Sequence, residues 1–153
     1  MNDFIIALAL HLLCVVLWIG GVAMVTLVLL PAVKSEPDAF NRFESIERRF
    51  ANQSRITVLL AGLSGFYMVW RLELWPRFAE PRFWWMHAMV AVWLIFFTML
   101  FVLEPFVLHK RLRMRASRDP RGTMLRIQRI HLVLLALSLI TIASAVAGSH
   151  GAF

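Results

Sequence analysis

Long apolar runs dominate the pattern of this chain, and four of them are long enough to cross a bilayer. They cover about residues 4–33, 56–75, 83–108 and 130–148. A helix needs about 20 apolar residues to cross a hydrocarbon core roughly 30 Å thick. Because backbone polar groups find no water in lipid, these runs are expected to be helices and not strands. The pattern predicts an all-α integral membrane protein, an up-down bundle of four transmembrane helices in a single domain over residues 1–153.

The composition agrees with a membrane protein and argues against a nucleic-acid partner. Hydrophobic residues make up 60% of the chain and charged residues only 16%, whereas soluble domains average about 45–50% and about 25%. The net charge of +7 comes from short basic patches between the apolar runs. Such patches are typical of membrane loops in contact with anionic lipid. The lipid bilayer is therefore the expected partner, and nucleic acid is not.

The basic residues set the expected orientation of the bundle. Thirteen of the 16 lysines and arginines lie within residues 34–55 and 109–129, the two connections that share one side of an up-down bundle. The positive-inside rule places these connections in the cytoplasm and both termini in the periplasm. The sequence thus predicts a multi-pass protein of the bacterial inner membrane. Residues 39–51 carry phenylalanines at helical spacing and are expected in the cytoplasmic interface, as a continuation towards the second span.

Two histidines lie inside the predicted spans, where an ionisable side chain is costly and is a functional candidate. His11 lies about two turns into the first span and His87 about one turn into the third, so both reach a similar depth below the periplasmic surface. Two imidazoles from different helices of a bundle suit axial ligation of a haem b. They would leave no open position on the iron, which favours electron transfer over oxygen chemistry.

Other residues at the periplasmic end would complete such a site. Arg77 and Arg82 are expected to pair with the haem propionates, and Trp18, Trp84 and Trp85 to line the pocket. The expected redox partner is a quinone or a periplasmic redox protein. Small residues that would let helices or a macrocycle approach closely are Gly20, Gly21, Gly62, Ser64 and Gly65.

Two other interpretations of the same histidines stay open. Soft and borderline copper ligands at the periplasmic face are offered by His11, Cys14, Met86, His87 and His150. In the third interpretation, His11 and His87 only bridge helices by hydrogen bonds. The chain would then be a non-catalytic subunit of a larger respiratory complex. Homo-oligomerisation also stays open.

The remaining polar residues near the membrane are interpreted without a ligand role. His109 and His131 lie beside arginines at the cytoplasmic ends of their spans. Glu104, next to Pro105, is expected to reach a cation of the cytoplasmic connections, and proton handling beside a proline kink is the alternative.

Several short motifs along the chain resemble one family of membrane proteins. The first run, ALHLLCVVLWIGGVAMVTLVLLPAV, contains Leu10-His11, Trp18 and Gly20-Gly21. Together with FESIERRFANQS, LSGFYMVW, WWMHAM and EPFVLHKRLR, it resembles the CopD-like copper-resistance membrane proteins. The chain is also similar to the HemJ-type protoporphyrinogen oxidases, a related four-helix group with an ALH start and an ERR segment before the second span.

These resemblances have different implications for function. The CopD-like family implies copper handling. The HemJ-type group implies porphyrinogen oxidation, a membrane oxidoreductase activity, and associates the histidines at His11 and His87 with haem. Where HemJ-type sequences have a tyrosine and a histidine near the inner end of the first helix, this chain has Leu29, Leu30 and Pro31. The CopD-like resemblance is therefore the closer of the two.

Overall fold

The structure is a computed structural model, and in the part of the chain that it describes all regular secondary structure is helical. It describes the backbone of residues 2–34 and 38–152, with the side chains of these residues apart from 105–111 and 113. In order, the elements are α1 (Asn2–Met24), η1 (Val25–Leu29), α2 (Leu30–Val33), α3 (Ala39–Arg71), η2 (Trp75–Ala79), η3 (Pro81–Phe83), α4 (Trp84–Thr98), η4 (Met99–Leu108), α5 (His109–Ala116) and α6 (Pro120–Ser149). The predicted all-α class is confirmed.

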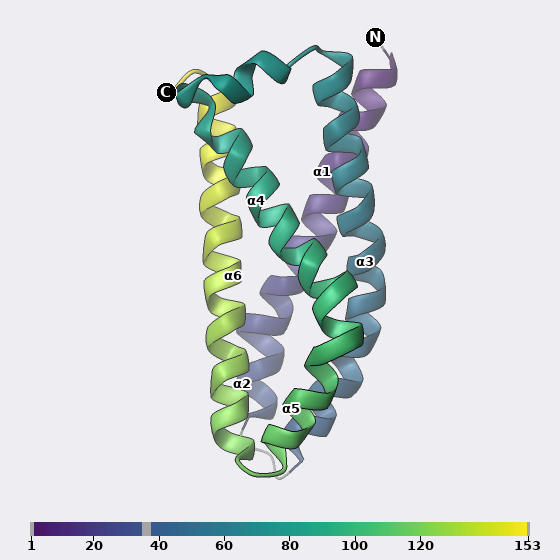
Figure 1. The fold of residues 1–153 in the computed structure, drawn as a ribbon, viewed down its shortest axis with the longest axis vertical. Coiled ribbons are helices and arrows are strands. Elements are labelled where there is room, and N and C mark those ends of the chain that lie inside the picture. Colours follow the sequence, from purple (N-terminus) through teal and green to yellow (C-terminus); the bar gives the residue numbers. More distant parts are fainter. Residues whose placement is uncertain (1, 35–37, 153) are drawn as a thin grey trace.

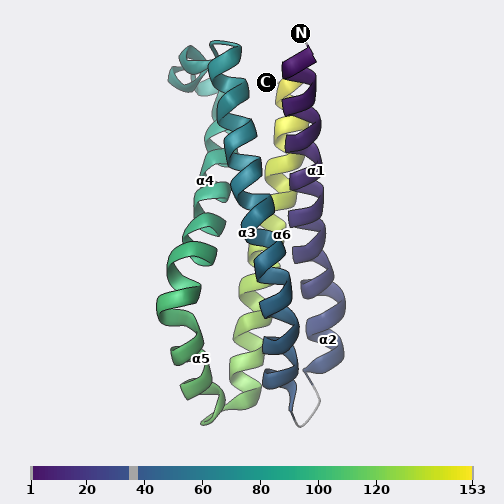
Figure 2. The ribbon, with the colours of Figure 1, turned by 90° about the vertical axis from the view of Figure 1, so that its right-hand side faces the viewer.

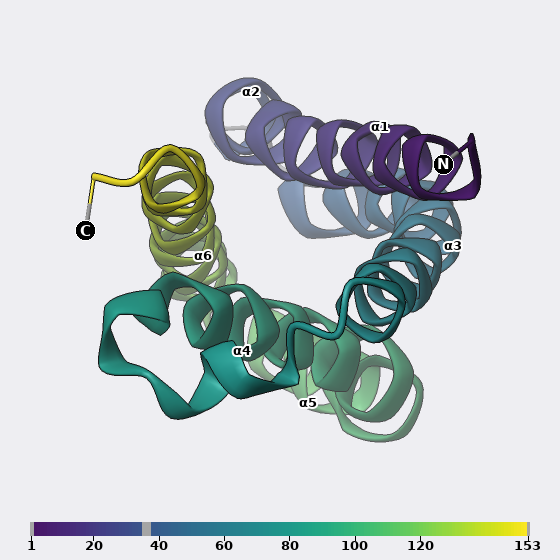
Figure 3. The same cartoon turned by 90° about the horizontal axis from the view of Figure 1, so that it is seen from above.

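These elements join into four rods that run up and down (Figure 1). One rod is α1, η1 and α2, another is α4, η4 and α5, and α3 and α6 are the other two. α1 packs along α3, and α4 packs along α6. Seen from above, α1 and α4 lie diagonally opposite each other, with α3 and α6 on either side (Figure 3). The view turned by 90° shows α3 and α6 between the other two rods (Figure 2).

Both termini and the η2–η3 segment lie at one end of the bundle, called the outer end below (Figure 1). The other end is called the inner end. Three helices are long and apolar enough to cross a membrane, Asn2–Val33, Pro81–Glu104 and Pro120–Ser149, which is consistent with a multi-pass membrane protein. α3 is not among them, because its apolar part between Arg55 and Arg71 holds only 15 residues. The fourth membrane crossing stays a prediction.

The helices extend further at the inner end than hydropathy predicts. α3 begins at Ala39, ahead of the expected start at residue 56, and α6 begins at Pro120, ahead of residue 130. Hydropathy marks only the part of a helix that lipid would cover, whereas many charged residues are good helix formers. Asp119 caps α6, because its Oδ1 accepts a hydrogen bond from the backbone amide of Gly122 at 2.9 Å.

The amphipathic residues 39–51 form the first part of α3 itself, continuous with the apolar part of that helix. Phe43 is 1% exposed, and burying such a side chain stabilises a fold by about 1.5–3 kcal/mol. It belongs to an apolar cluster at the inner end, with Val25, Leu30, Val33, Ala39, Met124 and Ile127. A second cluster, around Trp18, Val58 and Phe96, fills the middle of the bundle.

Two of the rods widen into π-helix near a proline. η1 ends two residues before Pro31, and η4 contains Pro105. Proline has no amide hydrogen, and in an α-helix its ring clashes with the carbonyl four residues earlier. A π-helical turn is wider and moves that carbonyl away from the ring. The prolines therefore give a local cause for both irregular segments.

Candidate functional site

His11 is held in one orientation by α3. Its Nδ1 atom lies 2.9 Å from the carbonyl oxygen of Ala61 and 3.2 Å from Oγ of Ser64. A carbonyl oxygen can only accept, so Nδ1 carries the hydrogen, and Nε2 of the neutral ring carries the lone pair. A Cβ atom at Gly65 would lie 3.3 Å from Cε1 of His11, so the absence of a side chain there allows the ring to approach α3. The result is an oriented imidazole with Nε2 available to a ligand.

Cys14 and Trp18 lie along the same side of α1 as His11, and both are buried. The indole ring of Trp18 meets the ring of Phe96 on α4 edge-on, with ring centroids 4.8 Å apart. Its Nε1 atom is buried without a hydrogen-bond partner in the part of the chain that the structure describes. Trp18 therefore lines the interior of the bundle, about two turns from His11.

His87 lies on the outward side of α4. It is exposed, and its ring meets Phe78 of η2 edge-on at a centroid distance of 5.2 Å. Trp85 and Phe96 are buried and share one face of α4, since 11 residues make about three full turns. His87 lies about 200° around the helix from Trp85. His87 thus points away from the interior of the bundle, whereas His11 is held against α3, and no hydrogen bond or ring contact joins the two rings among the described residues.

The predicted propionate partners lie at the outer rim of the bundle. The guanidinium groups of Arg77 and Arg82 lie over the ring of Phe83, at 5.0 and 4.6 Å from its centroid. Arg82 also pairs with Glu80, with Nε and Oε2 2.7 Å apart. Arg77 forms no ion pair with any carboxylate whose side chain is described. Arg77 is therefore the more available of the two to an anionic group.

Arg71, also at the outer end, is paired with a carboxylate of α1. The Nε atom of Arg71 lies 3.0 Å from Oδ2 of Asp3, which also accepts a hydrogen bond from the hydroxyl of Tyr67. This arginine ties α3 to the start of α1.

Trp84 is 44% exposed, whereas its neighbour Trp85 is buried with its indole against Gly148 of α6. Of the two tryptophans, only Trp85 faces the bundle.

The residues considered for copper do not form a cluster. Cys14 is buried among apolar side chains. His150 is exposed at the end of α6, where its Nδ1 donates to the carbonyl of Val146. Met86 is buried while the adjacent His87 is exposed. Among the described residues there is no group of three or more His, Cys, Asp and Glu side chains that could hold a metal ion.

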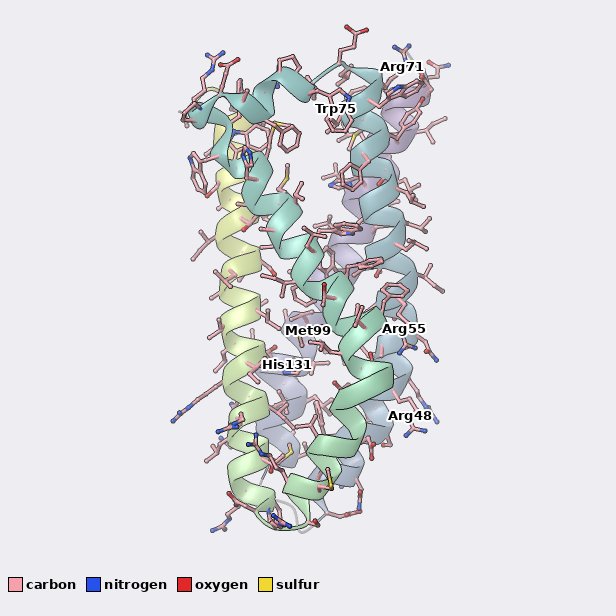
Figure 4. All side chains as sticks on the ribbon, in the orientation of Figure 1. Arg48, Arg55, Arg71, Trp75, Met99 and His131 are labelled. Atoms are coloured by element: carbon pink, nitrogen blue, oxygen red, sulfur yellow. The ribbon has the colours of Figure 1, made fainter. Side chains whose placement is uncertain are left out.

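A polar network midway along α3 joins this helix to the π-helical segment η4 (Figure 4). Nη2 of Arg55 lies 3.1 Å from Oε1 of Glu104, and its Nε donates to the carbonyl oxygen of Leu100 at 3.2 Å. In a π-helix the amide of residue 105 would bond to this carbonyl, but Pro105 has no amide hydrogen. The guanidinium of Arg55 donates to the carbonyl of Leu100 instead of that missing amide. The expectation that Glu104 pairs with a cation of a connection is confirmed. The sequence signal for the role of Arg55 was Pro105, five residues after Leu100, because it leaves the carbonyl of Leu100 in need of another donor.

Three carboxylates lie near one another beside this network. Glu44 is buried, and its Oε1 lies 3.8 Å from Nη2 of Arg48. Glu47 lies one turn further along the charged first part of α3, outside the apolar stretch. Burial, together with the negative charges of Glu104 and Glu44, raises the pKa of Glu47 to about 7.

His131, which the sequence places beside arginines at the cytoplasmic end of its span, is turned towards α3. Its ring meets Phe43 of α3 edge-on at 6.0 Å, and its Nδ1 donates to the carbonyl of Ile127 at 3.0 Å. Figure 4 shows His131 and Met99 both directed into the space between their helices. The spacing of His131 from the buried Ile127, Leu134 and Leu135 could have revealed this. The side chain of His109 lies outside the described part of the chain.

Comparisons of this chain with protein-family models, with curated proteins and with solved structures find no match. Its function is therefore argued below from its own residues.

Proposed function

We propose that all four rods cross the bacterial inner membrane, with both termini in the periplasm. α1 ends at the inner end, and α4 begins at the outer end (Figure 1). If these two cross the bilayer, α3, which connects them, must cross it as well. Its charged first part then projects beyond the hydrocarbon, where the basic residues of the connections also lie. The concentration of arginine and lysine at that end supports a cytoplasmic location for it.

We further propose that the chain is a b-type haem protein in which His11 is an axial ligand. One observation carries this proposal, the hydrogen bond from Nδ1 of His11 to the carbonyl of Ala61. Histidines that bind metals commonly donate their second nitrogen to such an acceptor, which fixes the tautomer and the ring orientation. An interior histidine held in this way presents Nε2 as a donor atom.

Two groups of the outer half of the bundle support a bound cofactor. Trp85 carries a buried indole N–H without an acceptor among the described residues, and a bound group with acceptor atoms would satisfy such a donor. At the rim, Arg77 is available to a propionate.

A bound haem would supply one-electron chemistry, between its ferric and ferrous states. Its redox partner would be a quinone in the bilayer or a periplasmic redox protein, as the sequence predicts. The chain itself would hold the group, exclude water from it with the apolar cluster around Trp18, and set its potential through the ligands. The sequence predicts His87 as the second ligand, but His87 is exposed on the outward side of α4 and meets Phe78 there.

A second candidate function is that of a non-catalytic membrane subunit. The observation that favours it is the same pair of hydrogen bonds, from His11 to Ala61 and to Ser64. These bonds already join α1 to α3, and interhelical hydrogen bonds of this kind contribute about 0.6 kcal/mol on average inside membranes. In this case His11 stabilises the bundle and binds nothing.

The visible spectrum of the protein, purified in mild detergent from haem-replete cells, separates the two candidates. For a haem protein we expect a Soret band, and resolved α and β bands after reduction with dithionite. Both should be lost in His11→Ala and kept in His150→Ala, because His150 is an exposed histidine at the same end.

Colourless protein would overturn the haem proposal. Unchanged haem content in His11→Ala would overturn the role of His11. If the wild type is colourless and His11→Ala only lowers the melting temperature, the subunit is supported. Copper bound by colourless protein, and lost in Cys14→Ser, would support copper handling instead.

A further inference from the structure

The contact between Trp18 of α1 and Phe96 of α4 fixes the register of two diagonal helices. Their rings meet edge-on at 4.8 Å in the middle of the bundle. Both helices begin at the outer end and run towards the inner end (Figure 1). Equal numbers of residues counted back from this contact therefore lead to similar depths on the two helices.

Seven residues before Trp18 is His11, and seven residues before Phe96 is Met89. Seven residues make about two turns, or about 10 Å along a helix, and return to nearly the same face. His11 and Met89 therefore lie at matched depth in the outer half of the bundle. Each lies on the face of its helix that carries the contact with the other helix.

The neighbours of Met89 on α4 locate the same face independently. Trp85, four residues before it, lies with its indole against Gly148 of α6. Trp93, four residues after it, donates from Nε1 to the carbonyl of Val58 on α3 at 2.9 Å. Each step of four residues turns the helix by about 40°. Met89 therefore points between α6 and α3, which is the direction of the diagonal helix α1.

His87 and Met86 do not share this direction. His87 lies about 160° from Met89 around α4, on the side that meets Phe78. Met86 lies about 60° away from Met89, beyond the direction of Trp93. Met89 is half-buried. Among the soft or borderline donors near the start of α4, Met89 is the one in register with His11.

We propose that Met89 is the second axial ligand of the haem, opposite His11. This inference rests on the proposed function, since it requires that a haem is bound. The thioether sulfur of methionine is a neutral, soft donor that binds ferrous haem well, and His/Met ligation raises the reduction potential above that of bis-histidine ligation. A haem held by His11 and Met89 would therefore have a higher potential than one held by two histidines.

The test uses the full-length protein in detergent, with visible and magnetic circular dichroism spectra and a redox titration. In the wild type we expect low-spin haem with the weak long-wavelength ferric band of sulfur ligation. Met89→Leu keeps the volume of the side chain and should lose that band, and its haem should become high-spin and bind carbon monoxide. Met86→Leu and His87→Ala should leave the spectra unchanged.

Met89→His provides a second variant that does not depend on how Met89→Leu folds. It should remain low-spin, lose the sulfur band and titrate at a lower potential than the wild type. The inference is overturned if Met89→Leu keeps the low-spin spectrum while His87→Ala loses it, which would identify His87 as the ligand and leave the proposed function intact. A wild-type protein without haem would overturn both proposals.

Discussion

The Nε atom of Arg55 donates a hydrogen bond to the carbonyl oxygen of Leu100, 3.2 Å away on another rod of the bundle. The same guanidinium reaches Glu104, one turn further along η4, at 3.1 Å. An arginine thus replaces the amide that Pro105 lacks and ties α3 to the π-helical segment. Because both partners of the ion pair are largely shielded from solvent, this contact is expected to matter more than an ion pair at the surface.

Replacing Arg55 by methionine should destabilise the bundle by about 1–3 kcal/mol, since a charge-assisted hydrogen bond and an ion pair with a buried carboxylate are lost together. The melting temperature in detergent measures the effect. Arg48→Met is the matched control, because Arg48 is 62% exposed in its side chain and lies 3.8 Å from Glu44. Equal melting temperatures for the two variants would contradict the role given to Arg55.

Glycine at position 62 is predicted to be required for the packing of α4 on α3. A Cβ atom there would lie 2.5 Å from the indole ring of Trp93, so Gly62→Ala must displace a ring that donates to Val58. The expected loss is about 1–3 kcal/mol, as for other overpacked sites. Gly20→Ala is the control, since a Cβ atom at Gly20 would have no neighbour within 4 Å. Thermal unfolding should show a lower melting temperature only for Gly62→Ala.

The sequence predicted the rods better than their contacts. Apolar runs locate the membrane parts of α1, α4 and α6 because lipid requires them, whatever the helices touch. The same runs are apolar on every side, so periodicity does not indicate how a helix is rotated. The outward position of His87 therefore could not be predicted from its depth alone. It became visible only once the packing of Trp85 and Phe96 was known.

The sequence predicted one of the two helix extensions at the inner end. Residues 39–51 were expected as an amphipathic continuation towards the second span, and they form the first part of α3. Residues 120–129 were expected in a connection, yet they continue α6, whose other face carries Ile127. Ala61 and Ser64 orient His11 through a backbone carbonyl, which every residue carries, and a serine hydroxyl, which is common in membrane helices. Only the position of α3 against α1 gives them that role.

Stability should depend on pH through Glu47. Its pKa is about 7 in the folded protein, against an ordinary value of 4.5, so between these values the folded state binds more protons than the unfolded state. Stability therefore falls as pH rises through this window. The penalty is absent below about pH 4.5 and complete above about pH 7.

Glu47→Gln, which stays neutral, should melt higher than the wild type at pH 8 and at about the same temperature at pH 4.5. Glu73→Gln, a change at a turn of the outer end, serves as the control. If Glu47→Gln leaves the pH dependence of the melting temperature unaltered, the folded carboxyl does not have the raised pKa assigned to it.

Loss of haem should depend more on Arg77 than on Arg82. Arg82 is already paired with Glu80, whereas Arg77 has only the ring of Phe83 among the described contacts. An exposed ion pair contributes up to about 1 kcal/mol, which corresponds to roughly a fivefold change in affinity. Transfer of haem to an apo-acceptor protein should be faster by about this factor in Arg77→Gln, and nearly unchanged in Arg82→Gln. The reverse order would rule out Arg77 as the propionate partner.

The membrane crossing of α3 can be tested by the accessibility of single cysteines in intact cells, in a Cys14→Ser background. A cysteine at Ser149 and one at Phe78 should react with a membrane-impermeant maleimide, because both lie at the outer end (Figure 1). A cysteine at Ser45 should react only after the cells are opened, since the first part of α3 lies at the inner end. If α3 did not cross, Ser45 and Phe78 would lie on the same side and give the same result. Opposite results would establish the fourth crossing. Labelling of the cysteine at Phe78, and not the one at Ser45, in intact cells would also establish the orientation that the basic residues predict.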